Sequence, residues 1–286
     1  MKTALVTGAS SGIGRATVGR LDAAGWKVFA GVRKEEDAAA LRAEGSERLE
    51  PLLLDVLDPD AIAAAAERVA AEQGGLDALV DNAGAAVPGP LEALPIEDFR
   101  RQVELNLTAQ LAVTQAMLPA LRAARGRVVL ISSVGGRVAL PFTGAYHAAK
   151  FGLEGLGDSL RQELAPWGIK VVLIEPGSID TPIWTRGEED ADRILGDAPP
   201  RMRELYGAAI ERYRKVVRDT AERGIPPEKV AAKIERALEA RRPRARYLIG
   251  IDAQVMARAR AILPTPVFDR FVAQAMGFPK PPEVGE

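Results

Sequence analysis

The chain has 286 residues, a length that suits one large α/β domain or two small ones. Hydrophobic residues make up 47% and charged residues 27% of the sequence, which is typical of a folded globular protein and excludes wholesale disorder. Lysine and arginine number 38 against 39 aspartate and glutamate, so the net charge is -1. No overall positive field favours nucleic acid or an anionic membrane as a partner.

Residue types that often carry chemistry are scarce in this sequence. Cysteine is absent, which removes disulfides, thiolate nucleophiles and cysteine zinc ligands and fits a reducing compartment. His147 is the single histidine, so we expect no metal site. The apolar stretch after Met1 is too short for a signal peptide, and no run of about 18 apolar residues predicts a membrane span. We therefore expect a cytoplasmic protein.

Short apolar runs alternate with longer helical patterns along the chain. The runs cover residues 4–6, 28–32, 52–54, 76–80, 128–131 and 171–174, and a seventh covers 247–249. Nearly all-apolar strands separated by helices are typical of a parallel sheet buried on both faces. The sequence therefore predicts an α/β fold with a single doubly wound Rossmann-type sheet, whose ligands bind beyond the carboxyl ends of the strands.

Helices are also predicted after the sixth run. Between residues 182 and 227, apolar side chains recur at three- and four-residue spacings, at Met202, Leu205, Tyr206, Ala209, Ile210, Tyr213 and Val217. This stripe predicts an amphipathic helix, which is either packed scaffold or a lid over a ligand. A helix at 252–263, a break at Pro264–Pro266 and another amphipathic helix follow, and residues beyond Gly277 resemble a frayed tail.

The chain shows no linker and no internal repeat, so we predict a single domain of residues 1–286. Within it we expect a cofactor and catalytic core at 1–180, a substrate lid at 181–228 and a helical C-terminal extension at 250–286.

The first apolar run leads into a glycine-rich turn, from Thr7 to Arg15. Glycines let backbone N–H groups approach a phosphate, and the N-terminus of the following helix favours an anion. The turn also matches a serine-hydrolase elbow at Ser10, but only seven residues precede Gly8, too few for the oxyanion loop. A nucleoside triphosphate loop would need lysine at Arg15 and serine or threonine at Ala16. The turn therefore favours a dinucleotide.

The end of the second apolar run indicates which dinucleotide. A ribose 2′-hydroxyl is usually held there by a carboxylate, whereas a 2′-phosphate prefers a cation. Arg33 and Lys34 follow Val32, and the first acid is Glu35. We therefore predict NADP(H) in preference to NAD(H), with a solvated strand-end arginine as the alternative interpretation of Arg33.

A tyrosine and a lysine lie four residues apart in a predicted helix, at Tyr146 and Lys150. Their β-carbons would be about 5–6 Å apart on one helix face, so the phenol and the ammonium can share a site. A nearby cation favours a phenolate and lowers the tyrosine pKa from about 10 toward a value useful for proton transfer. The same spacing also occurs where a ring simply packs and an amine is solvated. His147 projects about 100° from Tyr146, and we expect a structural role for it.

Five motifs occur in one order along the chain: TGxxxGIG at 7–14, NAG at 82–84, Ser133, YxxxK at 146–150 and PG at 176–177. In them the sequence resembles the short-chain dehydrogenase/reductase family over roughly residues 1–250. Segments 28–33, 145–147 and 174–182 look most like the retinol and hydroxysteroid dehydrogenase branches. The family usually has Asn-Asn-Ala-Gly, and Asp81 departs from the first position of that motif.

This resemblance implies a cofactor site. The glycine turn would hold the pyrophosphate and ribose, Arg33 the 2′-phosphate, and Asp55, which with Val56 ends the third expected strand, the adenine. Ile179 and Thr181 would fix the nicotinamide carboxamide. The full implied set is Gly8, Ser10, Ser11, Gly12, Ile13, Gly14, Arg33, Asp55, Val56, Asn82, Ala83, Gly84, Tyr146, Lys150, Pro176, Gly177, Ile179 and Thr181.

The resemblance also implies four catalytic residues, Asn106, Ser133, Tyr146 and Lys150. Ser133 would polarise the substrate oxygen, Tyr146 would transfer the proton, and Lys150 would bind the nicotinamide ribose and lower the Tyr146 pKa. Asn106 would position a water that connects Lys150 to solvent, with a helix-kink amide as the alternative. Successive strand side chains face opposite ways, and the spacing to Tyr146 favours Ser133 over Ser132.

The segment after Thr181 sets specificity in this family and is rich here in apolar residues, so we expect a lipophilic ketone or aldehyde and its alcohol. One alternative is a 3-oxoacyl thioester reductase, which the long extension after Tyr247 disfavours. Another is an NADP(H) sensor without turnover, which the complete catalytic set disfavours. Family habit implies a homodimer or homotetramer. For Arg258 and Arg260 we prefer a subunit or core contact to a peripheral membrane contact.

Overall fold

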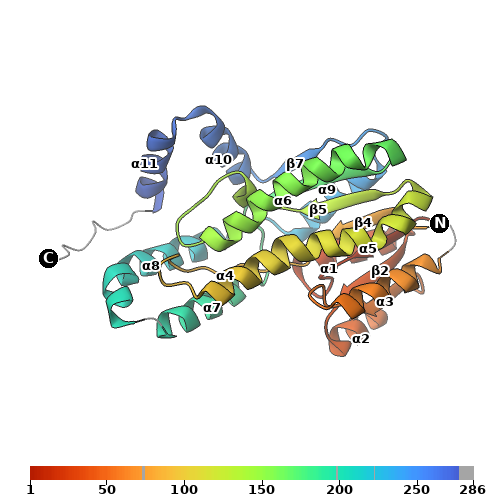
Figure 1. The fold of residues 1–286 in the computed structure, drawn as a ribbon, viewed down its shortest axis with the longest axis horizontal. Coiled ribbons are helices and arrows are strands. Elements are labelled where there is room, and N and C mark those ends of the chain that lie inside the picture. The colour runs from red at the N-terminus through yellow and green to blue at the C-terminus, as the bar shows by residue number, and fades with distance from the viewer. Residues whose placement is uncertain (73–74, 198, 222, 277–286) are drawn as a thin grey trace.

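The computed structural model describes residues 1–72, 75–197, 199–221 and 223–276 (Figure 1). Its centre is a seven-stranded parallel sheet in the order β3-β2-β1-β4-β5-β6-β7. The strands are β1 (Thr3–Val6), β2 (Lys27–Val32), β3 (Leu49–Leu53), β4 (Ala78–Asp81), β5 (Arg127–Ile131), β6 (Lys170–Pro176) and β7 (Arg246–Ile249). The order reverses between β1 and β4, so the predicted doubly wound sheet is confirmed.

Helices join the strands and cover both faces of the sheet. They are α1 (Gly12–Ala23), α2 (Glu35–Glu44), α3 (Pro59–Ala70), α4 (Ile96–Val103), α5 (Ala109–Ala124), α6 (Gly144–Glu163), α7 (Ile183–Asp197), α8 (Pro200–Ala221), α9 (Pro227–Glu239), α10 (Ile251–Ile262) and α11 (Thr265–Met276). Short helical turns are the π-helix η1 (Glu104–Thr108) and the 3-10 helices η2 (Val134–Gly136) and η3 (Ala165–Trp167). In the described part of the chain, no helix is both long enough and apolar enough to cross a membrane.

Each face of the sheet has its own apolar core, because side chains alternate along a strand. In β1, Ala4 and Val6 pack into a core with α1, α2 and α9, whereas Leu5 packs into a second core with α3, α5 and α6. Both faces of the sheet are thus buried, which explains why the strands read as nearly continuous apolar runs.

Two strands, β3 and β4, have residue bounds that differ from those predicted from the sequence. β3 is an edge strand with alternating burial, so the apolar-run criterion found only its end, and Asp55 and Val56 follow this strand instead of ending it. The β4 prediction began too early because Leu76 is buried and apolar but donates its N–H to the carbonyl of Ala120. The apolar runs therefore located every strand but not the exact residues at which it begins and ends.

The segment after β6 holds two helices, α7 and α8, where the sequence predicted one. The predicted stripe lies within α8, which begins at Pro200 because proline is tolerated in the first turn of a helix. For the same reason α11 begins inside the predicted proline break, at Thr265. α7, α8, α10 and α11 lie at one end of the molecule, away from α2 and α3 (Figure 1). The tail predicted beyond Gly277 lies outside the described residues.

Candidate active site

The glycine turn between β1 and α1 has a backbone that only glycine adopts easily. Gly8 and Gly12 have φ angles of 64° and 54°. A Cβ atom at Gly14 would lie 2.2 Å from the Gly8 carbonyl oxygen and 2.6 Å from Asn82 Nδ2, so a side chain cannot fit there. The Ser11 side chain makes no capping hydrogen bond at the start of α1. The first-turn N–H groups are therefore free of a side-chain cap and suit an anion such as a pyrophosphate.

A cluster of hydrogen bonds ties this turn to the end of β4. The Thr7 hydroxyl accepts from the N–H groups of Asn82 and Ala83, at 2.9 and 3.0 Å. The Asn82 amide donates to the carbonyls of Thr7 and Gly8, at 3.0 and 3.1 Å. Gln110 on α5 donates to the Ala83 carbonyl at 2.6 Å. The predicted residues of both segments thus form one rigid unit.

The roles of Thr7 and Gln110 escaped sequence analysis. Thr7 stands in the Thr-Gly pair that opens the glycine motif, so its position was a usable signal. Gln110 lies inside a helix far along the chain from Ala83, and no local pattern points to it.

Asn106 lies in the π-helix η1 between α4 and α5 and is fully buried. Its Nδ2 donates to the Ala85 carbonyl at 2.7 Å, and its Oδ1 accepts from the Ala85 N–H at 3.1 Å. A Cβ atom at Gly84 would lie 2.5 Å from that Oδ1, so glycine is needed there. These bonds match the kink-amide interpretation of Asn106, while its contact with a water stays a prediction.

The structure brings Ser133, Tyr146 and Lys150 together at the carboxyl ends of β5 and β6. Ser133 precedes η2, two residues after the end of β5, and its hydroxyl oxygen accepts from the Gly135 N–H at 3.0 Å. Lys150 Nζ donates to the Ile131 carbonyl at 2.7 Å and lies 5.8 Å from the centre of the Tyr146 ring. Ser132 is buried and its hydroxyl has no hydrogen-bond partner among the described residues, while the choice of Ser133 as the catalytic serine stays a prediction.

Burial has the largest effect on the pKa values of Tyr146 and Lys150. It raises the pKa of Tyr146, and the hydrogen bond from Ser133 opposes that rise. The net shift is thus upward and arises from burial, while a lowering of the Tyr146 pKa by Lys150 stays a prediction. Burial also lowers the pKa of Lys150 to about 8, against the opposing charges of Glu154 and Asp81.

Asp81, the departure from the family pattern, is buried at the end of β4. Its two carboxylate oxygens accept from the hydroxyls of Thr7 and Thr114, at 3.3 and 3.2 Å. Burial raises its pKa to about 7, and both hydroxyls and the Lys150 charge oppose that rise. The site thus accommodates a carboxylic acid where the family usually has an amide.

The loop after β6 reaches back to the glycine turn. Gly177 donates its N–H to the Ile249 carbonyl at 2.8 Å, and the Thr181 methyl lies 3.0 Å from where a Gly12 Cβ would be. A Cβ atom at Gly177 would lie 2.3 Å from an Asp252 carboxylate oxygen, which itself accepts from the Ser178 N–H at 2.7 Å. Sequence analysis missed this role of Asp252, which begins α10 far along the chain.

Predicted residues around Pro176 and Ile179 occupy the same loop. Pro176 ends β6, and its carbonyl accepts from the Ser133 hydroxyl at 3.5 Å. Ile179 is buried and pairs with Ile225 in a parallel bridge. Ser133 and the loop predicted to hold the nicotinamide are therefore in direct contact.

The residues predicted for the adenosine end lie at the ends of β2 and β3. These ends are adjacent, since Val32 pairs with Leu53. Arg33 is exposed and makes no hydrogen bond or ion pair with another described residue. Asp55 accepts the Leu57 N–H at 3.0 Å, and Val56 packs into the core beneath. The cation and the carboxylate both remain available to a ligand.

The other predicted residues of the turn differ in burial. Ser10 and Ser11 are half-buried in the loop, and Ile13 packs against the first core. Arg15 forms an ion pair with Glu44 on α2 and also donates to the Ser10 carbonyl at 3.4 Å. The Arg15 side chain therefore connects the glycine turn to α2.

His147 has the structural role that we expected. Its Nε2 accepts from the Leu140 N–H at 2.9 Å, and its Nδ1 lies 2.8 Å from the Gly135 carbonyl oxygen. Burial lowers its pKa, which favours the neutral ring. His147 thus fixes the loop between η2 and α6, next to Tyr146 and Ser133.

The helices after β6 contact this loop through aromatic rings. Phe142 has a φ of 64°, a strained value for a side-chain-bearing residue, and its ring meets Tyr206 and Tyr213 at 6.4 and 5.6 Å. Tyr206 also donates to Glu92 at 2.6 Å. A small apolar pocket lies there, lined by Pro88, Gly89, Pro90, Phe142, Ala191, Ile210, Tyr213 and Arg214. The Trp184 side chain lies outside what the structure describes.

Comparison with known proteins agrees with this geometry. A family model described as short chain dehydrogenase matches residues 2–192. An NADPH-dependent 3-dehydrocapnine reductase of Ornithobacterium rhinotracheale is 36% identical, over 94% of this chain and 95% of that protein. Retinol dehydrogenase 5 of Mus musculus is 39% identical, over 92% of this chain and 85% of its own length.

A solved structure is also similar over the whole fold. It is a short chain dehydrogenase from Burkholderia cenocepacia in complex with NADP, with a TM-score of 0.72 and 26% identity over 98% of this chain and all of that chain. A retinol dehydrogenase among the relatives confirms the predicted likeness to that branch. The chain therefore belongs to the short-chain dehydrogenase/reductase family and is an NAD(P)-dependent oxidoreductase that acts on alcohol or carbonyl groups.

Proposed function

We propose that the chain is an NADP(H)-dependent oxidoreductase that interconverts a lipophilic ketone or aldehyde and its alcohol. The observation that carries this proposal is the meeting of Ser133, the buried Tyr146 and the buried Lys150 at the carboxyl ends of β5 and β6. The glycine cradle and the adjacent first turn of α1 fit a dinucleotide, because both offer backbone N–H groups without side-chain obstruction.

The residues of the trio divide the proton chemistry between them. The bound nicotinamide supplies or accepts the hydride. The Ser133 hydroxyl orients the substrate oxygen, and the Tyr146 phenol gives that oxygen its proton during reduction. Because burial raises the Tyr146 pKa, the phenol is protonated near neutral pH. A protonated phenol is the form that carbonyl reduction requires.

Arg33 supports NADP(H) as the preferred cofactor. Its guanidinium is exposed at the end of β2, makes no ion pair with a described residue, and can accept a 2′-phosphate through charge-assisted hydrogen bonds. A relative at 36% identity is named as NADPH-dependent, and a similar solved structure contains NADP. The adenine would lie against Asp55 and Val56 at the neighbouring strand end.

The region around Phe142 supports a lipophilic substrate. Apolar and aromatic side chains from the loop after β4, the loop before α6 and the helices α7 and α8 surround a pocket of about 10 Å³ there, which a substrate would enter only if these helices move. In this proposal α7 and α8 form the substrate lid, closing over the carbonyl that Tyr146 protonates. We also propose that the protein is a homodimer or homotetramer in the cytoplasm. Size-exclusion chromatography with light scattering tests the oligomeric state.

The experiment is NADPH and NADH consumption by the purified protein against carbonyl compounds graded from small ketones to steroid-sized ones, with a 3-oxoacyl thioester included. We expect NADPH-dependent reduction whose kcat/KM rises with apolar size. Preference for the thioester would replace the proposed substrate class. Tight NADPH binding without turnover of any compound would favour a nucleotide sensor.

A further inference from the structure

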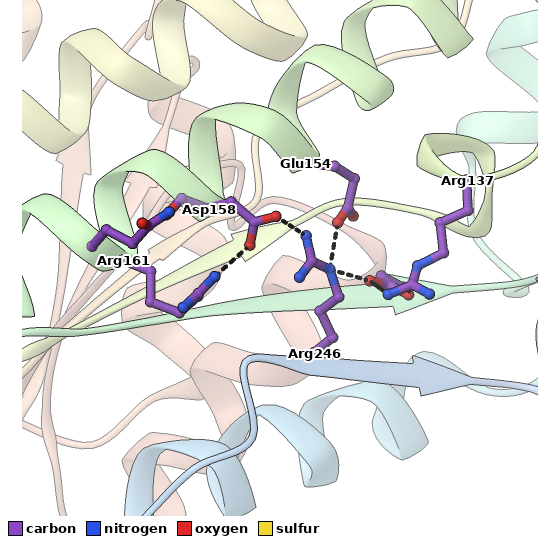
Figure 2. A network of polar contacts seen from close by, with 7 residues as sticks. Arg137, Glu154, Asp158, Arg161 and Arg246 are labelled. Atoms are coloured by element: carbon purple, nitrogen blue, oxygen red, sulfur yellow. Dashed lines mark hydrogen bonds and ion pairs between the residues drawn. The ribbon is translucent and has the colours of Figure 1, made fainter.

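A network of charges, two of whose carboxylates are buried, includes Glu154 on the same helix as Lys150. Figure 2 shows Arg246 of β7 between acidic side chains of α6 and β6. Arg246 Nε lies 2.9 Å from Glu154 Oε2 and 3.2 Å from Glu175 Oε1, and its Nη2 lies 2.8 Å from Asp158 Oδ2. Arg137, after η2, holds Glu175 from the other side at 2.8 Å.

Glu154 occupies a special place in this network. It lies four residues after Lys150 on α6, so the two side chains share one face of the helix. One carboxylate oxygen, Oε2, is bound to Arg246, whereas the buried Oε1 has no hydrogen-bond partner among the described residues. A Cβ atom at Gly136 would touch the Glu154 side chain and the Lys150 carbonyl, each at 2.9 Å. Only glycine there lets η2 pack directly against this pair.

We propose that Glu154 is a positioning residue for the reaction, whose carboxylate, anchored by Arg246, keeps the Lys150 ammonium charged beside Tyr146. The inference rests on the proposed function. A buried ammonium without a nearby anion tends to lose its proton, and a neutral Lys150 would no longer favour the phenolate or offer a positive charge to a ligand.

The other described charged groups near Glu154 and Lys150 are consistent with the proposed role of Glu154. On α6, Asp158 pairs with Arg161 and Arg246 and thus lies one turn further from Lys150. From β6, Glu175 is shared by Arg137 and Arg246. From β4, Asp81 is a second carboxylate whose charge acts on Lys150. Glu154 and Asp81 are the two carboxylates that raise the pKa of Lys150 against the effect of burial.

The test compares Glu154→Gln with the matched control Asp158→Asn. Both variants remove one carboxylate from Arg246, but only Glu154 acts on Lys150. NMR of protein labelled at the lysine ε-carbons follows the titration of Lys150, assigned with Lys150→Arg. We expect the Lys150 midpoint to move to lower pH by roughly half a unit or more in Glu154→Gln and to stay in place in Asp158→Asn.

Turnover gives a second readout of the same change. In Glu154→Gln the alkaline limb of kcat/KM for NADPH-dependent reduction should move to lower pH by a similar amount, while Asp158→Asn keeps the wild-type profile. Glu154→Asp retains the charge, but its side chain is shorter by one methylene group. It should therefore give a smaller shift in both measurements. It also tests the inference if Glu154→Gln does not fold.

An unchanged Lys150 titration in Glu154→Gln, or an equal shift in Asp158→Asn, would overturn the inference. The absence of turnover in the wild-type protein would instead contradict the proposed function. In that case the NMR titration still decides whether Glu154 controls the charge of Lys150.

Discussion

The catalytic core and the helical segment after β6 are held in place by different kinds of contact. In the sheet region, buried side chains bond to backbone groups, as Gln110 does to Ala83 and Lys150 to Ile131. α7 and α8 are held by a few buried apolar side chains, such as Ile194 and Ile210, and by polar pairs nearer the surface, such as Arg193 with Asp98. The predicted site residues are therefore fixed by buried polar bonds, whereas α7 and α8 depend more on contacts near the surface, and we expect them to be the less stable region.

The largest contrast should appear between Arg246→Leu and Arg193→Leu. The first change leaves Glu154 and Glu175 as buried carboxylates without their shared partner and should cost about 3–5 kcal/mol. The second breaks a half-exposed pair between α7 and α4 and should cost no more than about 1 kcal/mol. Urea denaturation measures both, and equal losses would contradict the comparison.

Asp81→Asn should make stability depend less on pH. The folded-state pKa of Asp81 is raised to about 7 from its usual 3.8, so the wild-type protein loses stability as pH rises through this interval. Asparagine does not titrate, and the variant should gain on the order of 2–4 kcal/mol relative to wild type between pH 4 and pH 8.

The control for this effect is Asp158→Asn. Arg246 and Arg161 hold the pKa of Asp158 at about 2, below its usual 3.8, so its contribution is lost only as pH falls below about 4. Thermal unfolding should show an equal cost for Asp158→Asn at pH 5 and pH 8. A pH-independent difference between Asp81→Asn and wild type would show that Asp81 titrates normally.

Arg33→Ala should reduce the preference for NADPH over NADH. Loss of a charge-assisted bond to a 2′-phosphate should weaken NADPH binding roughly 10- to 100-fold and leave NADH binding unchanged. Fluorescence titration with both cofactors measures this, with Lys34→Ala as the neighbouring control. Equal loss for both cofactors would point to a structural defect in place of phosphate recognition.

Tyr206→Phe should have the smallest effect. The change removes the bond to Glu92 but keeps the ring that packs against Phe142. We expect a stability loss below about 1 kcal/mol and a change in KM of a few-fold at most, with kcat retained. Steady-state kinetics with a bulky ketone checks this, and a large fall in kcat would show that the contact belongs to the catalytic machinery.

The same contrast explains what could be predicted from the sequence. The sheet, the glycine turn and the order of Ser133, Tyr146 and Lys150 follow from local patterns, since strand alternation and helix spacing are short-range rules. The direction of the Tyr146 pKa could not be predicted, because it depends on how deeply the assembled fold buries the phenol.

Long-range partners account for most of what sequence analysis missed. Gln110, Asp252 and Arg246 reach the site from helices or strands remote in sequence, and no motif links them to it. The two-helix form of the segment after β6 was also missed, because the apolar stripe marks only α8. Such contacts arise from tertiary packing and are not encoded in local periodicity.

The most direct test of the account is a comparison of wild-type protein with Tyr146→Phe, measuring both NADPH-dependent carbonyl reduction and NADPH binding. The variant keeps the ring but removes the hydroxyl that is proposed to transfer the proton. The account predicts that turnover falls by about 10²- to 10⁴-fold while the Kd for NADPH is unchanged. Turnover retained within a few-fold of wild type would contradict the assignment of Tyr146 as the proton donor.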